Sequence, residues 1–226
     1  MTIAHSLVIF DVEGTLVDSS ALTLRCWQET LQAFGFEFPL ATLQRHSGQD
    51  PHDMLHALLP GPHVTRVVPR VIEAQGRRYR DKYLSHVRAF PEVRALFERV
   101  KRGRQLIAVA TSSSADELDR YLALTNVGDL VDALACGDDV QHDKPGSALI
   151  KVALLRAGKL APEDTIMIGD TPYDAIAAKR AGVVGTIGML SGGFPRRDLE
   201  ASGCIAVYRD PTDLLAHYEE TVRLQA

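Results

Sequence analysis

The sequence has little of what marks several specialised classes of protein. Its 226 residues contain only three cysteines, Cys26, Cys136 and Cys204, which lie far apart and lack metal-ligand spacing. They stand among apolar neighbours, which predicts small core residues in a reducing, cytoplasmic setting rather than a disulfide framework. No apolar run approaches the roughly 20 residues that cross a bilayer, and no repeat or low-complexity tract occurs. We therefore expect a globular protein without a membrane span.

The sequence also lacks a secretion signal and an excess of positive charge. Residues Met1–Phe10 have no basic segment and no cleavage-site pattern, so they predict a first strand rather than a signal peptide. The 25 basic and 29 acidic residues give a net charge of −4, which argues against a general nucleic-acid binder. The pattern favours a small molecule as partner, no nucleic acid and no membrane, for a monomer or a homodimer.

What is present is a regular alternation of apolar runs and helical patterns. Short apolar runs that end in polar or glycine-containing segments predict buried strands, at Leu7–Phe10, Leu106–Ala110, Ala133–Cys136, Thr165–Ile168, Val183–Ile187 and Cys204–Tyr208. Helical patterns lie between them, at Pro91–Lys101, Ala115–Leu124, Ser147–Ala157 and Tyr173–Ala181, and Asp210-Pro211 opens a last helix to about Leu224. This order predicts an α/β fold with a doubly wound parallel sheet.

One segment departs from the alternation. From Val17 to Arg88 no strand is predicted, while apolar residues such as Leu22, Cys26 and Leu31 recur at helical spacing. We expect residues 17–88 to form an inserted helical cap domain, and residues 1–16 and 89–226 to form the α/β core. Because the insertion leaves after the first strand, it should rise from the edge of the sheet where α/β folds bind ligands.

Segments with chemically useful side chains directly follow the predicted strands. Asp11 and Glu13 flank one residue after the first strand, and Gly14 permits a sharp turn. One carboxylate could attack phosphorus and the other could transfer a proton, although a solvated, Asp-rich turn would look the same. Asp170 and Asp174 follow another strand, where they could bind Mg²⁺ or simply cap a helix.

Two further segments suit a phosphate group. Thr111-Ser112-Ser113-Ser114 follows a strand and precedes a helix, so hydroxyls and backbone N–H groups could bind an anion there, or one residue could act only as an N-cap. Lys144 could balance the carboxylates and the phosphate, or it could be an ordinary surface charge. The joint occurrence of all these segments at one edge of one sheet favours an active site.

These motifs, in the order DVEGTL, ATSS, HDKP and GDTPYD, resemble those of the haloacid dehalogenase-like phosphatases, and the match covers essentially the full length. The phosphoglycolate-phosphatase-like and β-phosphoglucomutase-like members, which carry a helical cap, are the most similar. The resemblance implies a cytoplasmic, Mg²⁺-dependent phosphatase that acts on a small phosphorylated metabolite, of phosphoglycolate or sugar-phosphate type, through an aspartyl-phosphate.

The same resemblance implies a role for each matching residue. Asp11 would be the nucleophile, Glu13 the acid and base, and Lys144 would steady Asp11 and the transferred group. Thr111 and the Ser112 backbone N–H would bind the phosphoryl oxygens. The metal would be held by Asp11, the Glu13 carbonyl and Asp170, with Asp174 as a further ligand or a supporting anchor.

Glu13 departs from the family pattern, which usually has aspartate two residues after the nucleophile. The additional methylene reaches about 1.5 Å further, yet a carboxylate is retained, as in the similar DxEGT form of enolase-phosphatases. We expect Glu13→Asp to leave activity unchanged or to raise it. A sugar phosphomutase, a metal-independent haloacid dehalogenase and a catalytically weak or silent member remain alternatives, and Ser147-Ala148 is a second departure, in a loop.

Substrate specificity should come from the predicted cap, because the core recognises only phosphate. Arg45, His46 and Gln49, with His52, cluster beside Gly48 and could contact a polar leaving group or form a solvated surface. Trp27, Phe34 and Phe36 are expected to form the apolar interior of the cap.

Overall fold

A computed structural model describes residues 7–59, 61, 64–140, 146–158 and 161–223. The contacts within the chain divide it into two compact units. Residues 1–18 and 88–226 form the first, called the core unit here, and residues 19–87 form the second, called the insert unit. Each boundary lies within two residues of the one expected from the sequence, while the role of the insert unit as a cap stays a prediction. No helix in the described ranges is both long and apolar enough to cross a membrane.

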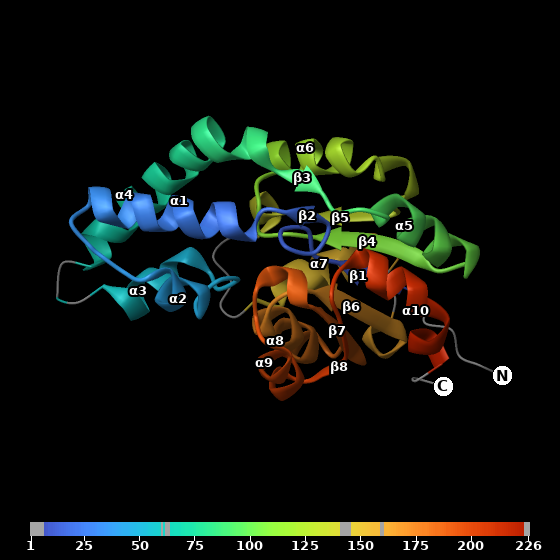
Figure 1. Ribbon diagram of the computed structural model, residues 1–226. Helices are drawn as coiled ribbons and strands as arrows, with labels where there is room; N and C mark the ends of the chain where they lie inside the picture. Colours follow the sequence, from blue (N-terminus) through green and yellow to red (C-terminus); the bar gives the residue numbers. More distant parts are fainter. Residues whose placement is uncertain (1–6, 60, 62–63, 141–145, 159–160, 224–226) are drawn as a thin grey trace. The chain divides into compact units, whose positions relative to one another are not determined.

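The core unit is built on a six-stranded parallel sheet. Its order is β5-β4-β1-β6-β7-β8, where the strands are β1 (Leu7–Phe10), β4 (Leu106–Ala110), β5 (Ala133–Ala135), β6 (Thr165–Gly169), β7 (Gly185–Met189) and β8 (Cys204–Tyr208). The chain runs from β1 outward to β5 and then returns to β6 on the other side of β1, which is the doubly wound topology. The predicted fold class is confirmed (Figure 1).

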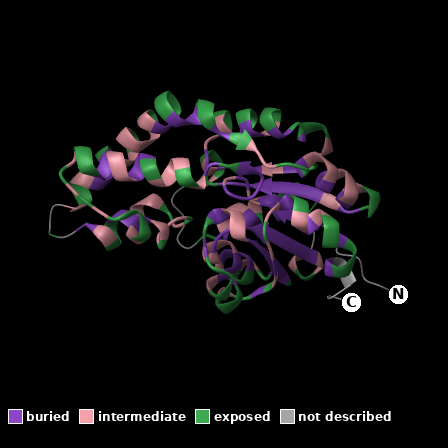
Figure 2. Ribbon diagram, viewed as in Figure 1, coloured by how far each residue is buried: buried purple, intermediate pink, exposed green. Residues whose placement is uncertain are grey.

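Helices cover both faces of this sheet. They are α5 (Val93–Arg102), α6 (Ala115–Thr125), α7 (Ala148–Arg156), α8 (Pro172–Ala181), α9 (Arg196–Ser202) and α10 (Pro211–Arg223). One face packs on α7 and α8 through residues such as Ile9, Ala108 and Met167. On α5, Phe97 stacks on Phe10 of β1, with ring centroids 4.5 Å apart. Figure 2 shows the central strands buried along their length, which explains why they read as continuous apolar runs.

The register of the three central strands aligns their carboxyl ends. Phe10, the last residue of β1, pairs with Val109 of β4 on one side and with Ile168 of β6 on the other. The residues that follow these positions therefore leave the sheet at one edge and at similar height. This alignment brings together motifs that are about 100 and 160 residues apart in the sequence.

The prediction for one strand was displaced by two residues. The sequence favoured Val183–Ile187, whereas β7 spans Gly185–Met189. The difference arises because Gly182 has a left-handed φ of 83° and ends α8, and the Val183 N–H still bonds the Ala178 carbonyl at 3.0 Å. The apolar run therefore begins in the helix cap. The helix α9 was not predicted.

A short antiparallel pair, also absent from the prediction, lies where the two units join along the chain. Strand β2 (Val17–Asp18) pairs with β3 (Arg88–Ala89), both in the core unit. The expectation of no strand from Val17 to Arg88 was therefore wrong at its two ends. Two residues per strand are too few to produce an alternating pattern, and the pairing joins positions 70 and 72 residues apart, so the sequence carried no signal for it.

The insert unit is helical, as predicted. It contains α1 (Ser20–Ala33), α2 (Leu40–Gln44), α3 (Pro51–Leu58) and α4 (Val64–Arg78), followed by a π-helical turn at Tyr79–Tyr83 and a 3₁₀ turn at Leu84–His86. Trp27 lies in its apolar core, and Phe34 and Phe36 pack against that core, as the sequence indicated.

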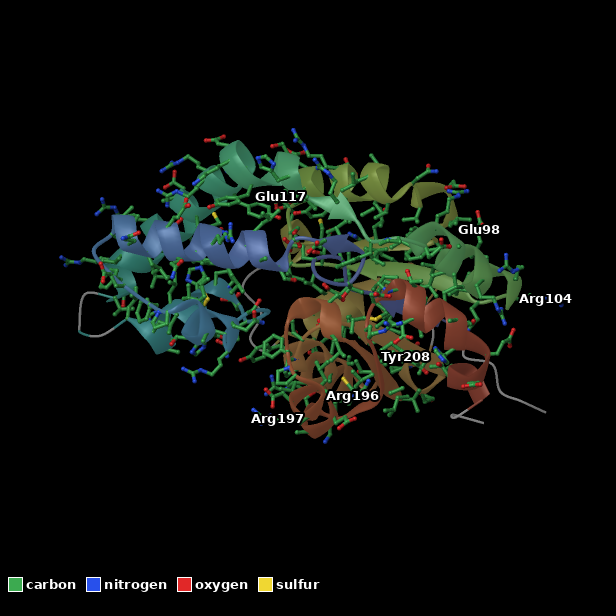
Figure 3. All side chains as sticks on the ribbon, viewed as in Figure 1. Glu98, Arg104, Glu117, Arg196, Arg197 and Tyr208 are labelled. Carbon is green, nitrogen blue, oxygen red and sulfur yellow. The ribbon has the colours of Figure 1, made fainter. Side chains whose placement is uncertain are left out.

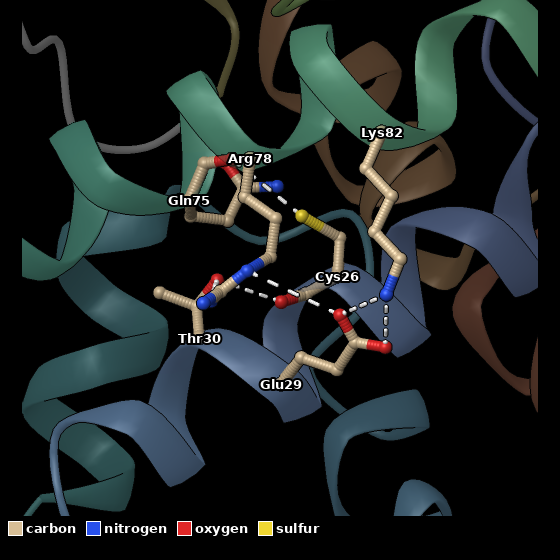
Figure 4. Close-up of polar contacts among 6 residues, drawn as sticks. All are labelled: Cys26, Glu29, Thr30, Gln75, Arg78 and Lys82. Carbon is tan, nitrogen blue, oxygen red and sulfur yellow. Dashed lines mark hydrogen bonds and ion pairs between the residues drawn. The ribbon is translucent and has the colours of Figure 1, made fainter.

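Polar contacts also join α1 to α4 and to the π-helical turn (Figure 4). The Lys82 ammonium lies 2.7 Å from a carboxylate oxygen of Glu29, and the Arg78 guanidinium donates to the Thr30 hydroxyl at 2.7 Å. The Cys26 thiol donates to the Gln75 carbonyl, and burial raises the pKa of this thiol to about 11. All three cysteines are free and buried, which confirms their role as core residues.

Candidate active site

The first functional segment is a tight turn after β1. The Asp11 N–H bonds the Ile168 carbonyl at 2.9 Å, so the backbone stays attached to β6 beyond the end of the strand. The Val12 carbonyl then accepts the N–H groups of Thr15 and Leu16, and Gly14 takes a φ of 82°. A left-handed conformation of this kind is easiest for glycine. The turn leaves the Asp11 side chain partly exposed at the carboxyl edge of the sheet.

Thr15 connects this turn to the fourth motif. Its hydroxyl oxygen lies 3.2 Å from Asp11 Oδ2 and 3.2 Å from Asp170 Oδ1, and the threonine is fully buried. A hydroxyl has one proton, so it donates to one of these carboxylates at a time. Two carboxylates from motifs far apart in the sequence therefore flank one buried hydroxyl. Thr15 was not singled out from the sequence, although it stands inside the DVEGTL motif.

The carboxylates of this site lie in an electrostatically unfavourable environment. Burial raises the pKa of Asp11 well above its usual range, and the negative charges of Asp174, Asp170 and Glu13 raise it further. Burial likewise raises the pKa of Asp170, followed by repulsion from Asp174, while the Thr15 hydroxyl acts in the opposite direction. Crowded, desolvated carboxylates of this kind are typical of functional sites.

Asp174 serves a structural purpose at this site. It is the third residue of α8, and its Oδ2 accepts hydrogen bonds from the Thr171 N–H at 2.9 Å and the Thr171 hydroxyl at 2.8 Å. This is a capping box, which was the simpler of the two interpretations of the motif. Its carboxylate also packs on Gly169, where an added Cβ would lie 2.5 Å from Asp174 Cγ. These contacts make Asp174 an anchor of the α8 N-terminus, and metal binding by Asp174 stays a prediction.

Asp170 is held by a second backbone segment that the sequence did not reveal. Only 3% of its surface is exposed, and its carboxylate packs directly against Gly192, in the turn that follows β7. A Cβ atom on residue 192 would overlap Asp170 Oδ2. The turn at Leu190–Gly192 therefore fixes where the carboxylate can lie.

The segment after β4 is a hydrogen-bonded loop at the same edge. Thr111 is buried and its hydroxyl accepts the Ser113 N–H at 3.1 Å, which leaves the hydroxyl proton able to reach another acceptor. The Gly137 N–H bonds the Ser113 carbonyl at 2.8 Å, and Gly137 packs closely on Ser112. Ser114 is the N-cap of α6 and forms a capping box with Glu117, whose side chain is labelled in Figure 3. Ser114 is thus the cap, and Thr111 and Ser112 precede it.

Glu13 reaches this loop rather than open solvent. The Ser113 hydroxyl donates to Glu13 Oε2 at 2.7 Å, and the Tyr121 hydroxyl donates to Oε1 at 3.4 Å. Burial raises the pKa of Glu13; the bond from Ser113 opposes that rise, repulsion from Glu117 adds to it, and the bond from Tyr121 opposes it. Neither partner was assigned to Glu13 from the sequence. Ser113 stood within a motif, but no local pattern indicated Tyr121.

The contacts of the remaining predicted residues do not decide their role at the site. Lys144 lies outside the described residues. In the insert unit, His46 Nδ1 lies 2.9 Å from Gln49 Oε1, whereas Arg45 contacts the Thr42 hydroxyl, to which it donates at 3.4 Å. Asp50 caps α3 by accepting the His52 N–H at 2.7 Å. Their contact with a substrate stays a prediction.

The donor set at the site resembles a partial metal shell. Within the described ranges, no three His, Cys, Asp or Glu side chains are grouped so as to hold a metal by themselves. Mg²⁺ commonly binds through one or two carboxylates and completes its shell with waters and phosphate oxygens. Asp11 and Asp170, on either side of Thr15, could supply that pair.

Comparison with known proteins identifies the family of this chain. The sequence pattern of the haloacid dehalogenase-like hydrolases matches residues 8–187. The pyrophosphatase PpaX of Oceanobacillus iheyensis is 24% identical over 176 residues, which cover 78% of this chain and 79% of that protein. A phosphorylated carbohydrates phosphatase of Thermotoga maritima is 23% identical over 215 residues, which cover 95% of this chain and 99% of that protein.

The fold agrees as well. The crystal structure of a hydrolase from Pseudomonas syringae superposes with a TM-score of 0.84 at 27% identity, and the match covers 95% of this chain and 98% of the other. The family resemblance that the four motifs predicted is thereby confirmed. Since the family pattern extends over most of the chain, and since its first, second and fourth motifs meet at one edge of the sheet, this enzyme belongs to the haloacid dehalogenase-like hydrolases.

Proposed function

We propose that this hydrolase is a Mg²⁺-dependent phosphatase that transfers the phosphoryl group of a small phosphorylated metabolite to Asp11. The observation that carries the proposal is the pair Asp11 and Asp170 on either side of the Thr15 hydroxyl. The Thr111–Ser113 loop lies at the same edge and is joined to the Asp11 turn through Glu13. Nucleophile, metal ligands and phosphate-binding groups are the parts that phosphoryl transfer requires.

The residues present fit a magnesium ion. Asp170 is buried and its pKa is raised by desolvation and by a neighbouring carboxylate, so its ionised form gains from a cation close by. Asp11, Asp170 and the Glu13 carbonyl would hold the ion, and Asp174 would support them through the α8 cap. The bound metal would neutralise negative charge on the phosphoryl group and on the carboxylates.

The residues of this enzyme would hydrolyse the phosphate ester in two steps. In the first, an Asp11 carboxylate oxygen bonds to phosphorus, the ester P–O bond breaks, and the leaving oxygen takes a proton from Glu13. In the second, water attacks the phosphorus of the aspartyl-phosphate, Glu13 takes the proton of that water, and phosphate leaves with Asp11 restored. The Thr111 hydroxyl and the Ser112 N–H would hold the phosphoryl oxygens, and Lys144 would balance their charge.

The relatives and the polar residues of the insert unit support a proposal for the substrate class. A pyrophosphatase and a phosphatase of phosphorylated carbohydrates are among the similar proteins. We propose an alkyl phosphate of the phosphoglycolate or sugar-phosphate type, in which Arg45, His46 and Gln49 contact the part of the substrate that leaves. A core that binds only the phosphoryl group would accept many esters, so these residues would supply selectivity.

Hydrolysis of a panel of phosphate esters tests the proposal. The panel contains phosphoglycolate, sugar phosphates, pyrophosphate and a chromogenic aryl phosphate, each with Mg²⁺ and with a chelator. We expect Mg²⁺-dependent phosphate release that Asp11→Asn reduces by at least about a thousandfold. The exposed Asp119→Asn on α6 is the matched control and should keep full activity. Retention of most activity by Asp11→Asn would refute the assignment of Asp11 as the nucleophile. Undiminished turnover in the presence of the chelator would refute the requirement for Mg²⁺.

A further inference from the structure

The Glu13 carboxylate is held at both of its oxygens by hydroxyl groups that have no assigned role in the reaction. Ser113 donates to Oε2 at 2.7 Å and Tyr121 donates to Oε1 at 3.4 Å. Both donors are buried, with 7% and 2% of their surfaces exposed. They come from the loop after β4 and from α6, about 100 residues further along the chain than Glu13.

We propose that Ser113 and Tyr121 are positioning residues that fix the Glu13 carboxylate for proton transfer to the leaving group. This inference rests on the proposed phosphatase function. A free glutamate side chain samples many rotamers, and the conformational entropy lost on ordering it raises the barrier of the reaction. This cost is avoided when the fold has already fixed the side chain. One donor on each oxygen defines both the position and the orientation of the carboxylate.

Both donors are themselves firmly placed. The Ser113 N–H bonds the Thr111 hydroxyl at 3.1 Å and the Ser113 carbonyl accepts the Gly137 N–H at 2.8 Å. Tyr121 lies in the interior of α6, where the Thr125 hydroxyl bonds its carbonyl at 2.7 Å. A donor that is anchored through its own backbone loses little freedom when it binds the carboxylate.

Different residues of the loop after β4 thus contact two different reacting groups. Thr111 and the Ser112 backbone are the proposed phosphate-binding groups, whereas Ser113 directs its hydroxyl to Glu13. The loop therefore couples the location of the phosphoryl group to the location of the proton donor. A rigid connection of this kind sets the distance between them, on which the rate of proton transfer depends.

The arrangement also accounts for glutamate at position 13. Its side chain is one methylene longer than aspartate, about 1.5 Å on standard bond lengths. This length spans from the Asp11 turn to the Ser113 and Tyr121 hydroxyls. A shorter carboxylate would leave buried hydroxyl groups without their acceptor, which is unfavourable.

A comparison of two leaving groups tests the proposal. The substrates are the most active alkyl phosphate of the panel, whose alkoxide needs a proton, and dinitrophenyl phosphate, whose phenolate leaves without one. The readout is kcat/KM, which covers the steps up to departure of the leaving group. We expect Ser113→Ala and Tyr121→Phe each to lower kcat/KM at least tenfold for the alkyl ester and less than twofold for the aryl ester. Ser113→Thr keeps the hydroxyl and should restore the alkyl activity.

Matched controls separate this role from a general effect on folding. Tyr218→Phe removes another buried hydroxyl, which donates to Gln105 at 2.7 Å, and Ser202→Ala removes a partly buried hydroxyl, which donates to the Leu199 carbonyl at 2.7 Å. Both should leave kcat/KM unchanged for both substrates. Equal losses on the two esters in Ser113→Ala, or no loss on either, would overturn the positioning role.

A second measurement is independent of turnover. The urea midpoints of Ser113→Ala, Glu13→Gln and the double variant should be clearly non-additive, because the two groups share one hydrogen bond. Additive shifts would overturn the contact itself. Wild-type protein that is inactive on every ester would refute the proposed function instead, and non-additive midpoints would then show that the contact exists without serving catalysis.

Discussion

The backbone of Gly192 lies directly against the carboxylate of Asp170, so that residue 192 has no room for a side chain. Asp170 follows β6 and Gly192 follows β7, which are neighbouring strands of the sheet. The contact therefore joins the motif that we propose to bind the metal to a turn that carries no recognisable motif of its own. It fixes a carboxylate that is buried and repelled by Asp174.

We predict that Gly192→Ala weakens Mg²⁺ binding. The new methyl group would overlap Asp170 Oδ2 and displace the carboxylate from its partner Thr15. The Mg²⁺ concentration for half-maximal activity should rise by at least about tenfold, which corresponds to about 1.4 kcal/mol. A Mg²⁺ titration of activity measures it. Gly128→Ala, at a site where an added Cβ meets no atom within 4 Å, is the control that should behave as wild type.

Thr15→Val should destabilise the protein measurably. Valine matches threonine in shape but lacks the hydroxyl that bonds Asp11 and Asp170, so the partly buried Asp11 and the buried Asp170 lose the donor that they share. We expect the free energy of unfolding in chelator to fall by about 1–3 kcal/mol. Urea denaturation at neutral pH gives the value. Thr165→Val, which removes a bond from another fully buried threonine to the Ala161 carbonyl, should cost less because its acceptor carries no charge.

The fold and the grouping of several site residues could be predicted from the sequence because they depend on patterns within short segments. Buried parallel strands read as short apolar runs, and polar residues that end such runs meet at one edge. Asp11, Thr111 and Asp170 could be grouped in this way from topology alone. The predicted ends of β1, β4 and β8 agree with the structure, and the shift at β7 came from a helix cap within an apolar run.

The partners of these residues could not be predicted, because they depend on packing between distant segments. Ser113 and Tyr121 are 100 and 108 residues from Glu13, and no pattern within any short window couples them. The approach of Gly192 to Asp170 depends in the same way on where two strands place their turns. The β2–β3 pair was missed because each strand has only two residues.

The metal-free protein should lose stability as the pH rises. Burial and repulsion raise the pKa values of Asp11 and Asp170 in the folded state, so the folded state binds more protons than the unfolded state above about pH 4. The free energy of unfolding then falls as the pH rises from about 4 through the raised pKa values. Thermal unfolding in chelator from pH 4 to 8 measures this slope.

Removing one of the repelling charges should reverse part of that loss. At pH 7.5 in chelator, Asp11→Asn should unfold at a higher temperature than the wild type, by about 2–4 °C for each kcal/mol of repulsion relieved. Excess Mg²⁺ should raise the melting temperature of the wild type and remove most of its pH dependence. A wild-type melting temperature that rises steadily with pH in chelator would contradict the electrostatic interpretation of the site.

Glu13→Asp is the substitution for which the geometry changes the expectation. From the motif alone it should preserve or raise activity, because aspartate is the usual residue of the family at this position. The contacts of Glu13 argue the opposite, since Ser113 and Tyr121 lie where only the longer side chain reaches them. We now expect kcat/KM for an alkyl phosphate to fall by more than about tenfold, or 1.4 kcal/mol in the barrier.

The size of this loss should depend on the two hydroxyl groups. In the Ser113→Ala/Tyr121→Phe background, whose pocket no longer selects for glutamate, Glu13→Asp should cost less than about threefold. The exposed Glu220→Asp on α10 controls for the loss of a methylene and should have no effect. An aspartate variant as active as the wild type would show that the site tolerates either length, because the acid then works without the support of Ser113 and Tyr121.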